Sequence, residues 1–312
     1  MKALIGFTGF VGSNLANTQY THQYNSKNIN EIIGKEFEQV VCAGVRAEKF
    51  LANAYPQQDL AGIQELIEIL KQVKCNQFVL ISTIDIYKEP KNVDENTNIQ
   101  LEGLHAYGAN RYYMEEFVRN NFEDYLIVRL PALFGKGLKK NFIYDMIHKI
   151  PSMIMGSKFE EIITGASTEQ KVLLKCNYVQ NENGNWVVKQ ELEQNEKTKL
   201  KRALEEIGFT SLVFTDSRSR FPFYDLANLQ TDIDIAVENN IKELNIAVEP
   251  VSAEEVAREC FNTEFINIIE DKNPVYYDMK TIYADKWNGN NGYMYSNSQT
   301  LVAIKEFVKR WE

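Results

Sequence analysis

The chain has 312 residues, of which 44% are hydrophobic and 25% are charged, as in an ordinary soluble globular protein. Its formal net charge of -9 argues against a nucleic-acid-binding surface, because phosphate recognition needs a basic stripe that releases counterions. No window is long and apolar enough for a membrane span or signal peptide, and the four cysteines and three histidines lack the spacing of a metal site. We therefore expect a reduced, cytoplasmic protein without membrane, nucleic-acid or metal partners.

Apolar runs alternate with helical periodicity through the first half of the chain. The predicted strands span residues 2–7, 38–43, 77–82 and 125–130, and the predicted helices span residues 59–73 and 107–121. This alternation is typical of a parallel sheet with crossover helices, and it predicts an α/β fold. The second helix carries a wide apolar arc, which fits packing on the sheet alone or also on a second copy in a homodimer.

The pattern changes after residue 150. Residues 171–179 and 186–190 flank an Asn-rich turn and predict a β-hairpin, and the block 157–221 around it reads as a lid or substrate-side element. The later predictions are helices at residues 196–207 and 227–237, a strand at 244–248, a helix that opens with the capping box Ser252 to Glu255, and a loop at 288–297.

Glycines recur at three-residue spacing in Gly6-Phe-Thr-Gly9-Phe10-Val11-Gly12, directly after the first predicted strand. Missing β-carbons let a backbone approach a pyrophosphate, and the following helix start offers free N–H groups. This loop predicts dinucleotide binding by Gly6, Gly9, Phe10, Val11 and Gly12.

A further short strand is expected to end near Tyr24, and the segment after it indicates which dinucleotide is bound. A carboxylate usually meets the free 2′-hydroxyl of NAD about 20 residues beyond the glycine loop. Between Gly12 and Asn30 the chain has no carboxylate, whereas Asn25, Ser26 and Lys27 are suited to a 2′-phosphate. This favours NADP over NAD.

Five motifs occur in an order that resembles the extended short-chain dehydrogenase/reductases, the NAD(P)-dependent epimerases, dehydratases and reductases of nucleotide sugars. They are Gly6-x-x-Gly9-x-x-Gly12, Ser82-Thr-Ile-Asp-Ile-Tyr87, Tyr107-Gly-Ala-Asn-Arg111 with Glu115, Arg129-Leu-Pro-Ala-Leu-Phe-Gly135 and Asn245-Ile-Ala-Val-Glu-Pro250. The resemblance covers nearly the whole chain and is strongest from 1 to 135. It implies a Rossmann doubly wound parallel sheet with a smaller C-terminal α+β substrate domain. The expected domains are 1–134 plus about 222–248 for NAD(P), and about 135–221 plus 249–312 for the substrate.

The resemblance implies that Thr83 is the hydroxyl and Tyr107 the acid/base that share a proton with the substrate while hydride passes to or from nicotinamide. Position 111 departs from the pattern, because arginine replaces the lysine that binds the nicotinamide ribose and lowers the tyrosine's pKa. Arginine keeps the charge, but its planar fork is not interchangeable with an ammonium. We therefore assign Arg111 to both the catalytic and the cofactor-binding sets.

A second departure follows Thr83, where dehydratases of the family carry an acidic pair. Here the pair is Ile84 and Asp85, which weakens the case for a dehydratase. Asp85 remains a candidate proton-transfer group for an epimerase or a capping carboxylate.

Further residues follow from the resemblance by position. Ala43, Gly44 and Pro131 are expected beside the cofactor. Basic and amide side chains are candidates for the phosphates of a sugar nucleotide, namely Lys139, Lys140, Asn141, Arg218 and Arg220. Two hypotheses remain: a keto-sugar reductase or epimerase, and a catalytically weak protein that binds NADP(H) as a sensor or assembly module.

Overall fold

The computed structural model describes residues 1–16 and 19–311, which form two compact units. Unit 1 comprises Met1–Leu138, Arg220–Val251 and Tyr276–Ala303, and unit 2 comprises Lys139–Ser219, Ser252–Val275 and Ile304–Glu312. These limits differ from the predicted domains at residues 276–303, which group with the sheet. Which unit binds a substrate stays a prediction.

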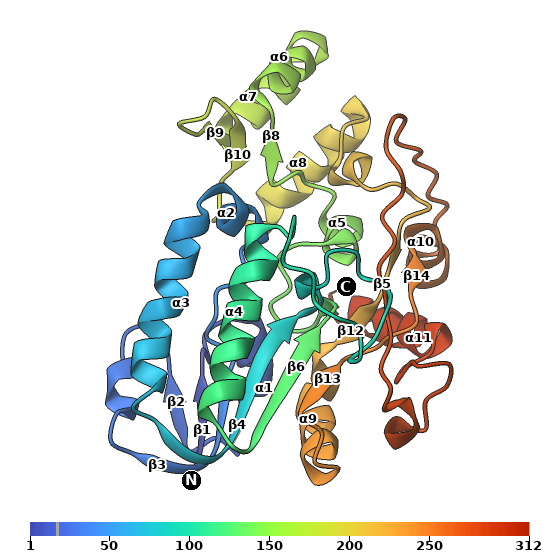
Figure 1. Ribbon diagram of the computed structural model, residues 1–312. Helices are drawn as coiled ribbons and strands as arrows, with labels where there is room; N and C mark the ends of the chain where they lie inside the picture. The colour runs from blue at the N-terminus through green and yellow to red at the C-terminus, as the bar shows by residue number, and fades with distance from the viewer. Residues whose placement is uncertain (17–18, 312) are drawn as a thin grey trace. The chain divides into compact units, whose positions relative to one another are not determined.

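A six-stranded parallel sheet forms the centre of unit 1 (Figure 1). Its order is β13-β6-β4-β3-β1-β2, with bounds β1 Lys2–Ile5, β2 His22–Tyr24, β3 Glu36–Cys42, β4 Lys74–Thr83, β6 Tyr125–Leu130 and β13 Glu243–Asn245. The chain runs from β2 across β1 to β3, so the strand order reverses beside β1. In doubly wound sheets, ligands bind at such a point, beyond the carboxyl ends of the strands.

Alternate residues of the central strands pack on opposite faces of the sheet. Helices α3 (Pro56–Leu70) and α4 (Ala106–Asn121) cover one face, and Figure 1 shows them side by side. Helices α1 (Phe10–Leu15) and α9 (Leu229–Glu238) contribute apolar side chains to the core on the other face. Strands with both faces buried read as continuous apolar runs, which is why the sequence predicted them.

Shorter elements complete unit 1. They are η1 Ile29–Ile32, α2 Lys49–Ala54, η2 Ile84–Ile86, β5 Lys91–Val93, β7 Ala132–Phe134, β11 Arg220–Phe221, β12 Phe223–Asp225, η4 Leu226–Asn228, β15 Asp278–Met279 and η5 Ala284–Trp287. Along the chain, β14 Val251–Ser252 and α11 Asn297–Lys309 lead from one unit into the other.

Unit 2 is mainly helical and has its own apolar core. Its elements are α5 Phe142–His148, β8 Met153–Ile154, α6 Gly156–Gly165, α7 Thr168–Asn177, β9 Tyr178–Gln180, β10 Trp186–Val188, α8 Gln194–Ile207, η3 Ser211–Phe214 and α10 Ala253–Phe261. The capping box predicted at Ser252 and Glu255 is present at the start of α10. Among the helices in the described ranges, none combines the length and apolarity that a membrane crossing requires.

The predicted hairpin is wrong in its first strand. A hairpin exists, but β9 starts only at Tyr178, and residues 171–177 belong to α7. The Ser167 side chain caps that helix in a reciprocal capping box with Gln170. This cap stabilises the helix start and outweighs the strand preference of Val172 and the following leucines.

Candidate active site

The glycine loop has the shape that a pyrophosphate-binding backbone requires. Gly6 has φ +86°, and a Cβ there would lie 2.4 Å from the carbonyl oxygen of Ala43. A Cβ on Gly12 would lie 2.0 Å from the carbonyl oxygen of Gly6. Among the described residues, a Cβ on Gly9 would meet only that same oxygen, at 3.4 Å, so this part of the loop stays open. Closed packing at two glycines and an open approach at the middle one fit a dinucleotide.

The residues expected beside this loop lie next to it in the sheet. Ala43 follows β3 and donates its N–H to the carbonyl of Ile5 at the end of β1, at 2.9 Å. Gly44 packs on the Ile5 side chain, where a Cβ would lie 2.9 Å from Cγ2. Both therefore lie at the carboxyl edge of the sheet, where the strand order reverses.

The segment proposed for the 2′-phosphate begins where β2 ends, at Tyr24, as the sequence predicted. The Asn25 side chain accepts a hydrogen bond from the Lys27 backbone N–H at 2.9 Å, and the Asn25 N–H donates to the Asn28 side chain at 2.7 Å. This turn leaves Ser26 and Lys27 exposed. The two side chains are thus presented to solvent at the carboxyl end of an edge strand.

Thr83 ends β4, and a 3-10 turn, η2, carries Asp85 directly after it. The Thr83 hydroxyl accepts the Asp85 N–H at 3.2 Å. The Asp85 carboxylate accepts a hydrogen bond from Lys49 Nζ at 2.6 Å and lies 3.7 Å from His105 Nε2. Burial alone would raise the pKa of Asp85, but the hydrogen bond with His105 and the charge of Lys49 outweigh it, so that its pKa lies below the ordinary value. Asp85 is therefore a paired carboxylate at neutral pH.

Close contact between α4 and η2 positions Tyr107. Gly108 lies so near η2 that a Cβ would be 2.1 Å from the carbonyl oxygen of Asp85. His105 caps α4 by accepting the Gly108 N–H on Nδ1 at 3.0 Å, which leaves the ring proton of the neutral imidazole on Nε2, facing Asp85. Asn53 on α2 accepts the Tyr107 N–H at 2.9 Å. The first turn of α4 is therefore fixed from three sides.

Three charges act on the Tyr107 phenol, which is buried. Burial raises its pKa above the ordinary value; the charge of Arg111 works against this rise, and the charge of Asp85 adds to it. A hydrogen bond with Thr83 and the charge of Lys49 also lower this pKa. The phenol is therefore a proton donor at neutral pH, and the balance of these charges sets its acidity.

Arg111 is held within the protein. Its guanidinium carbon lies 3.9 Å from the centroid of the Tyr107 ring, and its two terminal nitrogens donate to the Asp59 carboxylate and to the Arg46 carbonyl. Asn110 Nδ2 donates to the same Asp59 carboxylate at 2.8 Å. The Arg111 Nε is buried and has no hydrogen-bond partner among the described residues. Arginine thus joins α4, α3 and the segment after β3.

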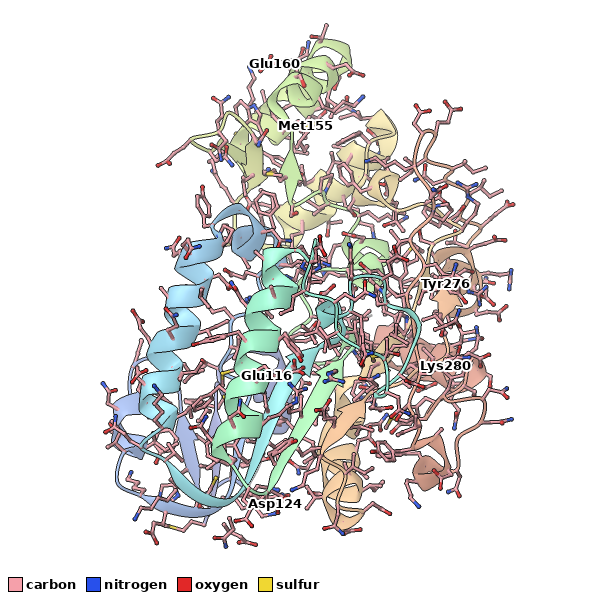
Figure 2. All side chains as sticks on the ribbon, viewed as in Figure 1. Glu116, Asp124, Met155, Glu160, Tyr276 and Lys280 are labelled. Atoms are coloured by element: carbon pink, nitrogen blue, oxygen red, sulfur yellow. The ribbon has the colours of Figure 1, made fainter. Side chains whose placement is uncertain are left out.

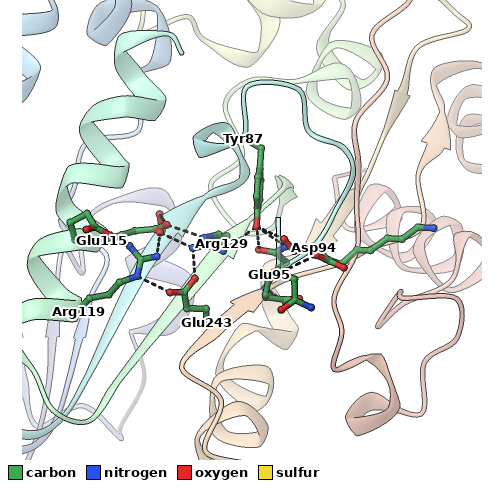
Figure 3. Close-up of polar contacts among 12 residues, drawn as sticks. Tyr87, Asp94, Glu95, Glu115, Arg119, Arg129 and Glu243 are labelled. Atoms are coloured by element: carbon green, nitrogen blue, oxygen red, sulfur yellow. Dashed lines mark hydrogen bonds and ion pairs between the residues drawn. The ribbon is translucent and has the colours of Figure 1, made fainter. Parts of the chain in front are cut away.

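Glu115, the next charged residue of the motif, forms the centre of a buried ion-pair network (Figure 3). Its carboxylate accepts Ser82 Oγ at 2.6 Å and pairs with Arg129 and Arg119, each at 2.8 Å. Glu243 pairs with the same two arginines. The network therefore connects β4, β6, β13 and α4 beneath the site.

Asp124, labelled in Figure 2, lies just before β6 begins. It is therefore at the amino-terminal end of this strand, whereas Thr83 is at the carboxyl end of the neighbouring strand β4.

The remaining predicted residues lie in several places. Pro131 follows Leu130, which is paired with Thr83 between β6 and β4. Arg220 is in unit 1 and donates to the Pro250 carbonyl at 2.9 Å. The other candidates for substrate phosphates belong to unit 2. Among them, Asn141 caps α5 and Arg218 forms a two-pronged ion pair with Asp216.

Two polar residues of the site had no assigned role in the sequence. Lys49 was missed because it lies in no motif, and only the packing of α2 brings its ammonium to Asp85. His105 stands directly before the helix of Tyr107, and a capping side chain at this place is a readable signal.

Comparisons with known proteins agree with this geometry. A family model described as NAD(P)H-binding matches residues 24–145. Three solved structures illustrate the likeness of the whole chain. They are a dTDP-4-dehydrorhamnose reductase from Bacillus anthracis in complex with NADP (13% identity, 99% of this chain and 97% of that chain, TM-score 0.62), one from Clostridium acetobutylicum (14%, 100% and 99%, 0.63), and a UDP-glucuronic acid 4-epimerase from Bacillus cereus in complex with UDP-glucuronic acid and NAD (15%, 100% and 100%, 0.59). No curated protein sequence matches the chain.

The chain therefore has the NAD(P)-binding α/β fold of the extended short-chain dehydrogenase/reductases. Its structural neighbours include reductases and epimerases of nucleotide sugars, at identities that establish the fold alone. The resemblance seen in the motifs is confirmed at this level.

Proposed function

We propose that the chain is an NAD(P)-dependent enzyme that acts on a nucleotide-activated sugar, as a keto-sugar reductase or an epimerase. One observation carries this proposal: Tyr107, Thr83 and Asp85 lie together at the carboxyl end of β4. In the same sheet, β1 is followed by a glycine loop whose backbone is open to a pyrophosphate. The structural neighbours that act on nucleotide sugars support the substrate class.

The site residues divide the chemistry as follows. A bound nicotinamide cofactor supplies or accepts hydride. Tyr107 donates its phenolic proton to the substrate oxygen in the reductive direction and recovers it in the oxidative direction. Thr83 hydrogen-bonds the same oxygen. Burial raises the pKa of Tyr107, so the phenol is in the protonated form that reduction requires.

Asp85 has a second role in the epimerase version of the proposal. As a paired carboxylate it would remove a proton from the carbon beside a ketone, and an acid or water on the opposite face of the enolate would return a proton there. In the reductase version Asp85 serves as a charged neighbour that adjusts the acidity of Tyr107.

The cofactor proposal is NADP in preference to NAD. Gly6, Gly9, Phe10, Val11 and Gly12 would hold the pyrophosphate. Exposed Ser26 and Lys27, with Asn25, would hold the 2′-phosphate, and Ala43, Gly44 and Pro131 would line the nucleoside. A cation at the end of the edge strand supports NADP because a 2′-phosphate is doubly charged. Lys139, Lys140, Asn141, Arg218 and Arg220 are proposed for the sugar-nucleotide phosphates, with Arg218 the weakest because Asp216 already neutralises it.

A specific observation favours a second candidate, a protein that binds NADP(H) without efficient turnover. Both terminal nitrogens of Arg111 are engaged by Asp59 and the Arg46 carbonyl. These contacts occupy part of the four terminal N–H groups and hold the guanidinium against α3 and the segment after β3, although its charge still acts on Tyr107.

One experiment separates the two candidates. NADPH and NADH are titrated by fluorescence, and loss of the reduced-nicotinamide absorbance is then followed with a panel of dTDP-, UDP- and GDP-linked 4-keto sugars. A parallel incubation with the corresponding 4-hydroxy sugars and catalytic NAD(P)+ reports epimerisation by chromatography. Turnover supports the enzyme, binding without turnover supports the sensor, and binding of neither dinucleotide overturns both.

A further inference from the structure

Lys49 places an ammonium in the site from outside the motifs. It stands at the first position of α2, and Nζ lies 2.6 Å from the Asp85 carboxylate. Burial lowers the pKa of Lys49, but the charge and hydrogen bond of Asp85 outweigh it and hold the pKa above the ordinary value. Tyr277 and Tyr107 also face this ammonium and act on its pKa. The chain therefore keeps a lysine charge near Tyr107, although position 111 has none.

Lys49 and Arg111 act on Tyr107 in different ways. The Arg111 guanidinium covers the ring of Tyr107 at 3.9 Å and is the stronger direct charge. Asp85 opposes ionisation of Tyr107 more strongly than Lys49 favours it directly. The larger effect of Lys49 is thus expected through Asp85, whose charge it pairs at hydrogen-bonding distance.

We propose that Lys49 is a positioning residue of this site, which holds the Asp85 carboxylate in place and offsets its charge beside Tyr107. The proposal deepens the function proposed above and rests on it, because the acidity of Tyr107 matters only if Tyr107 transfers a proton. Arg111 and Lys49 together then supply the positive charge that the motif lysine supplies beside the tyrosine in the family pattern. Arg111 covers the ring, and Lys49 neutralises the carboxylate on the turn after β4.

The geometry around Asp85 makes this role specific. The Asp85 N–H is bound to Thr83 Oγ1, and the Asp85 carbonyl abuts Gly108, so its backbone is fixed next to Tyr107. On the side-chain end, His105 lies 3.7 Å away and Lys49 lies 2.6 Å away. Loss of Lys49 would leave the carboxylate with His105 at 3.7 Å and without the ammonium at 2.6 Å.

The test reads the phenol directly. The sixteen tyrosines are labelled with 13C at Cζ, the Tyr107 signal is assigned by its loss in Tyr107→Phe, and the signal is titrated by NMR in the chain without substrate. We expect Lys49→Gln to raise the Tyr107 pKa by about one unit or more, because an opposing carboxylate becomes unpaired. Lys49→Arg should keep the native value, and Lys71→Gln, which removes a surface charge directly after α3, is the matched control.

A double variant tests the route through Asp85. In an Asp85→Asn background, Lys49→Gln should raise the pKa by less than half as much as in the native chain. The proposal is overturned if Lys49→Gln moves the pKa by less than about 0.3 unit, or if its effect is undiminished without the Asp85 charge. Circular dichroism confirms that each variant is folded. The readout needs no turnover, so a failure of the proposed function would appear separately, as absence of dinucleotide binding or of activity.

Discussion

The guanidinium of Arg111 stacks on the ring of Tyr107, one helical turn before it on α4, with 3.9 Å between Cζ and the ring centroid. The same guanidinium pairs with Asp59 on α3. Arginine at this position therefore supplies charge to the phenol and also links α3 to α4. A lysine would supply charge without the fork that makes both contacts.

Arg111→Lys should destabilise the fold, because one ammonium cannot satisfy both Asp59 and the Arg46 carbonyl. We expect a loss of about 1–3 kcal/mol in the free energy of unfolding, measured in urea. Asp59→Asn combined with Arg111→Lys should cost clearly less than the sum of the single variants, since both break one interaction. Additive losses would show that the pair is not coupled.

Glu115→Gln should be among the most destabilising conservative changes in unit 1. The substitution leaves Arg129 buried with one fewer counter-charge and should cost about 3 kcal/mol in urea unfolding. The neighbouring Glu116 is half exposed, and its ion pair with Arg119 lies at the solvent-exposed side of the network. Glu116→Gln is therefore the matched control, with an expected cost under about 0.5 kcal/mol. Equal costs would contradict the network in Figure 3.

Two glycines of the loop should respond differently to alanine. Gly12→Ala places a Cβ against the Gly6 carbonyl and should lower thermal stability by the equivalent of about 1–3 kcal/mol. Gly9→Ala has room for its methyl group and should fold normally, yet bind NADPH at least about tenfold more weakly because the methyl group blocks the approach of the pyrophosphate. Normal NADPH affinity in folded Gly9→Ala would place the pyrophosphate elsewhere.

The free energy of unfolding of unit 2 should depend on pH through Asp145 and His148 on α5, whose contributions change with pH in opposite directions. Burial raises the Asp145 pKa to about 6, so its contribution is present at low pH and is lost as pH rises from about 4 to 6. Burial, with Lys197 and Lys201, lowers the His148 pKa to about 4, so stability is gained as pH rises from about 4 to 6.5. The two slopes oppose each other.

Single variants separate these slopes. With Asp145→Asn, urea stability should rise more steeply from pH 4 to 6.5 than in the native chain, and with His148→Gln it should rise less or fall. The slope is the readout, because lost contacts such as that between His148 and Trp311 shift the whole curve. Parallel curves for all three chains would refute the assignment.

Much of the sheet could be predicted because its strands are buried on both faces. Residues 77–82 lie within β4, and residues 125–130 coincide with β6, where apolar side chains serve two cores. Residues 171–177 were misread because Val172, Leu173 and Leu174 are consecutive, whereas the helix is decided by the cap at Ser167. The hydrogen bonds of this cap stabilise the helix more than the apolar run favours a strand.

The site was readable only where its residues belong to motifs. Thr83 and Tyr107 could be paired in advance because the motifs that contain them resemble those of the extended short-chain dehydrogenase/reductases. The position of Lys49 depends on how α2 packs against η2, and the engagement of Arg111 depends on Asp59, more than fifty residues earlier. Such contacts arise from tertiary packing, which periodicity does not encode.

The most direct test of this account is the rate of Tyr107→Phe with NADPH and the nucleotide keto-sugar that the native chain reduces. We predict a loss of at least about 100-fold in kcat, because the phenylalanine ring has no proton to give, while the NADPH dissociation constant stays unchanged. A Tyr107→Phe variant that turns over at the native rate would contradict the assignment of Tyr107 as the acid/base group.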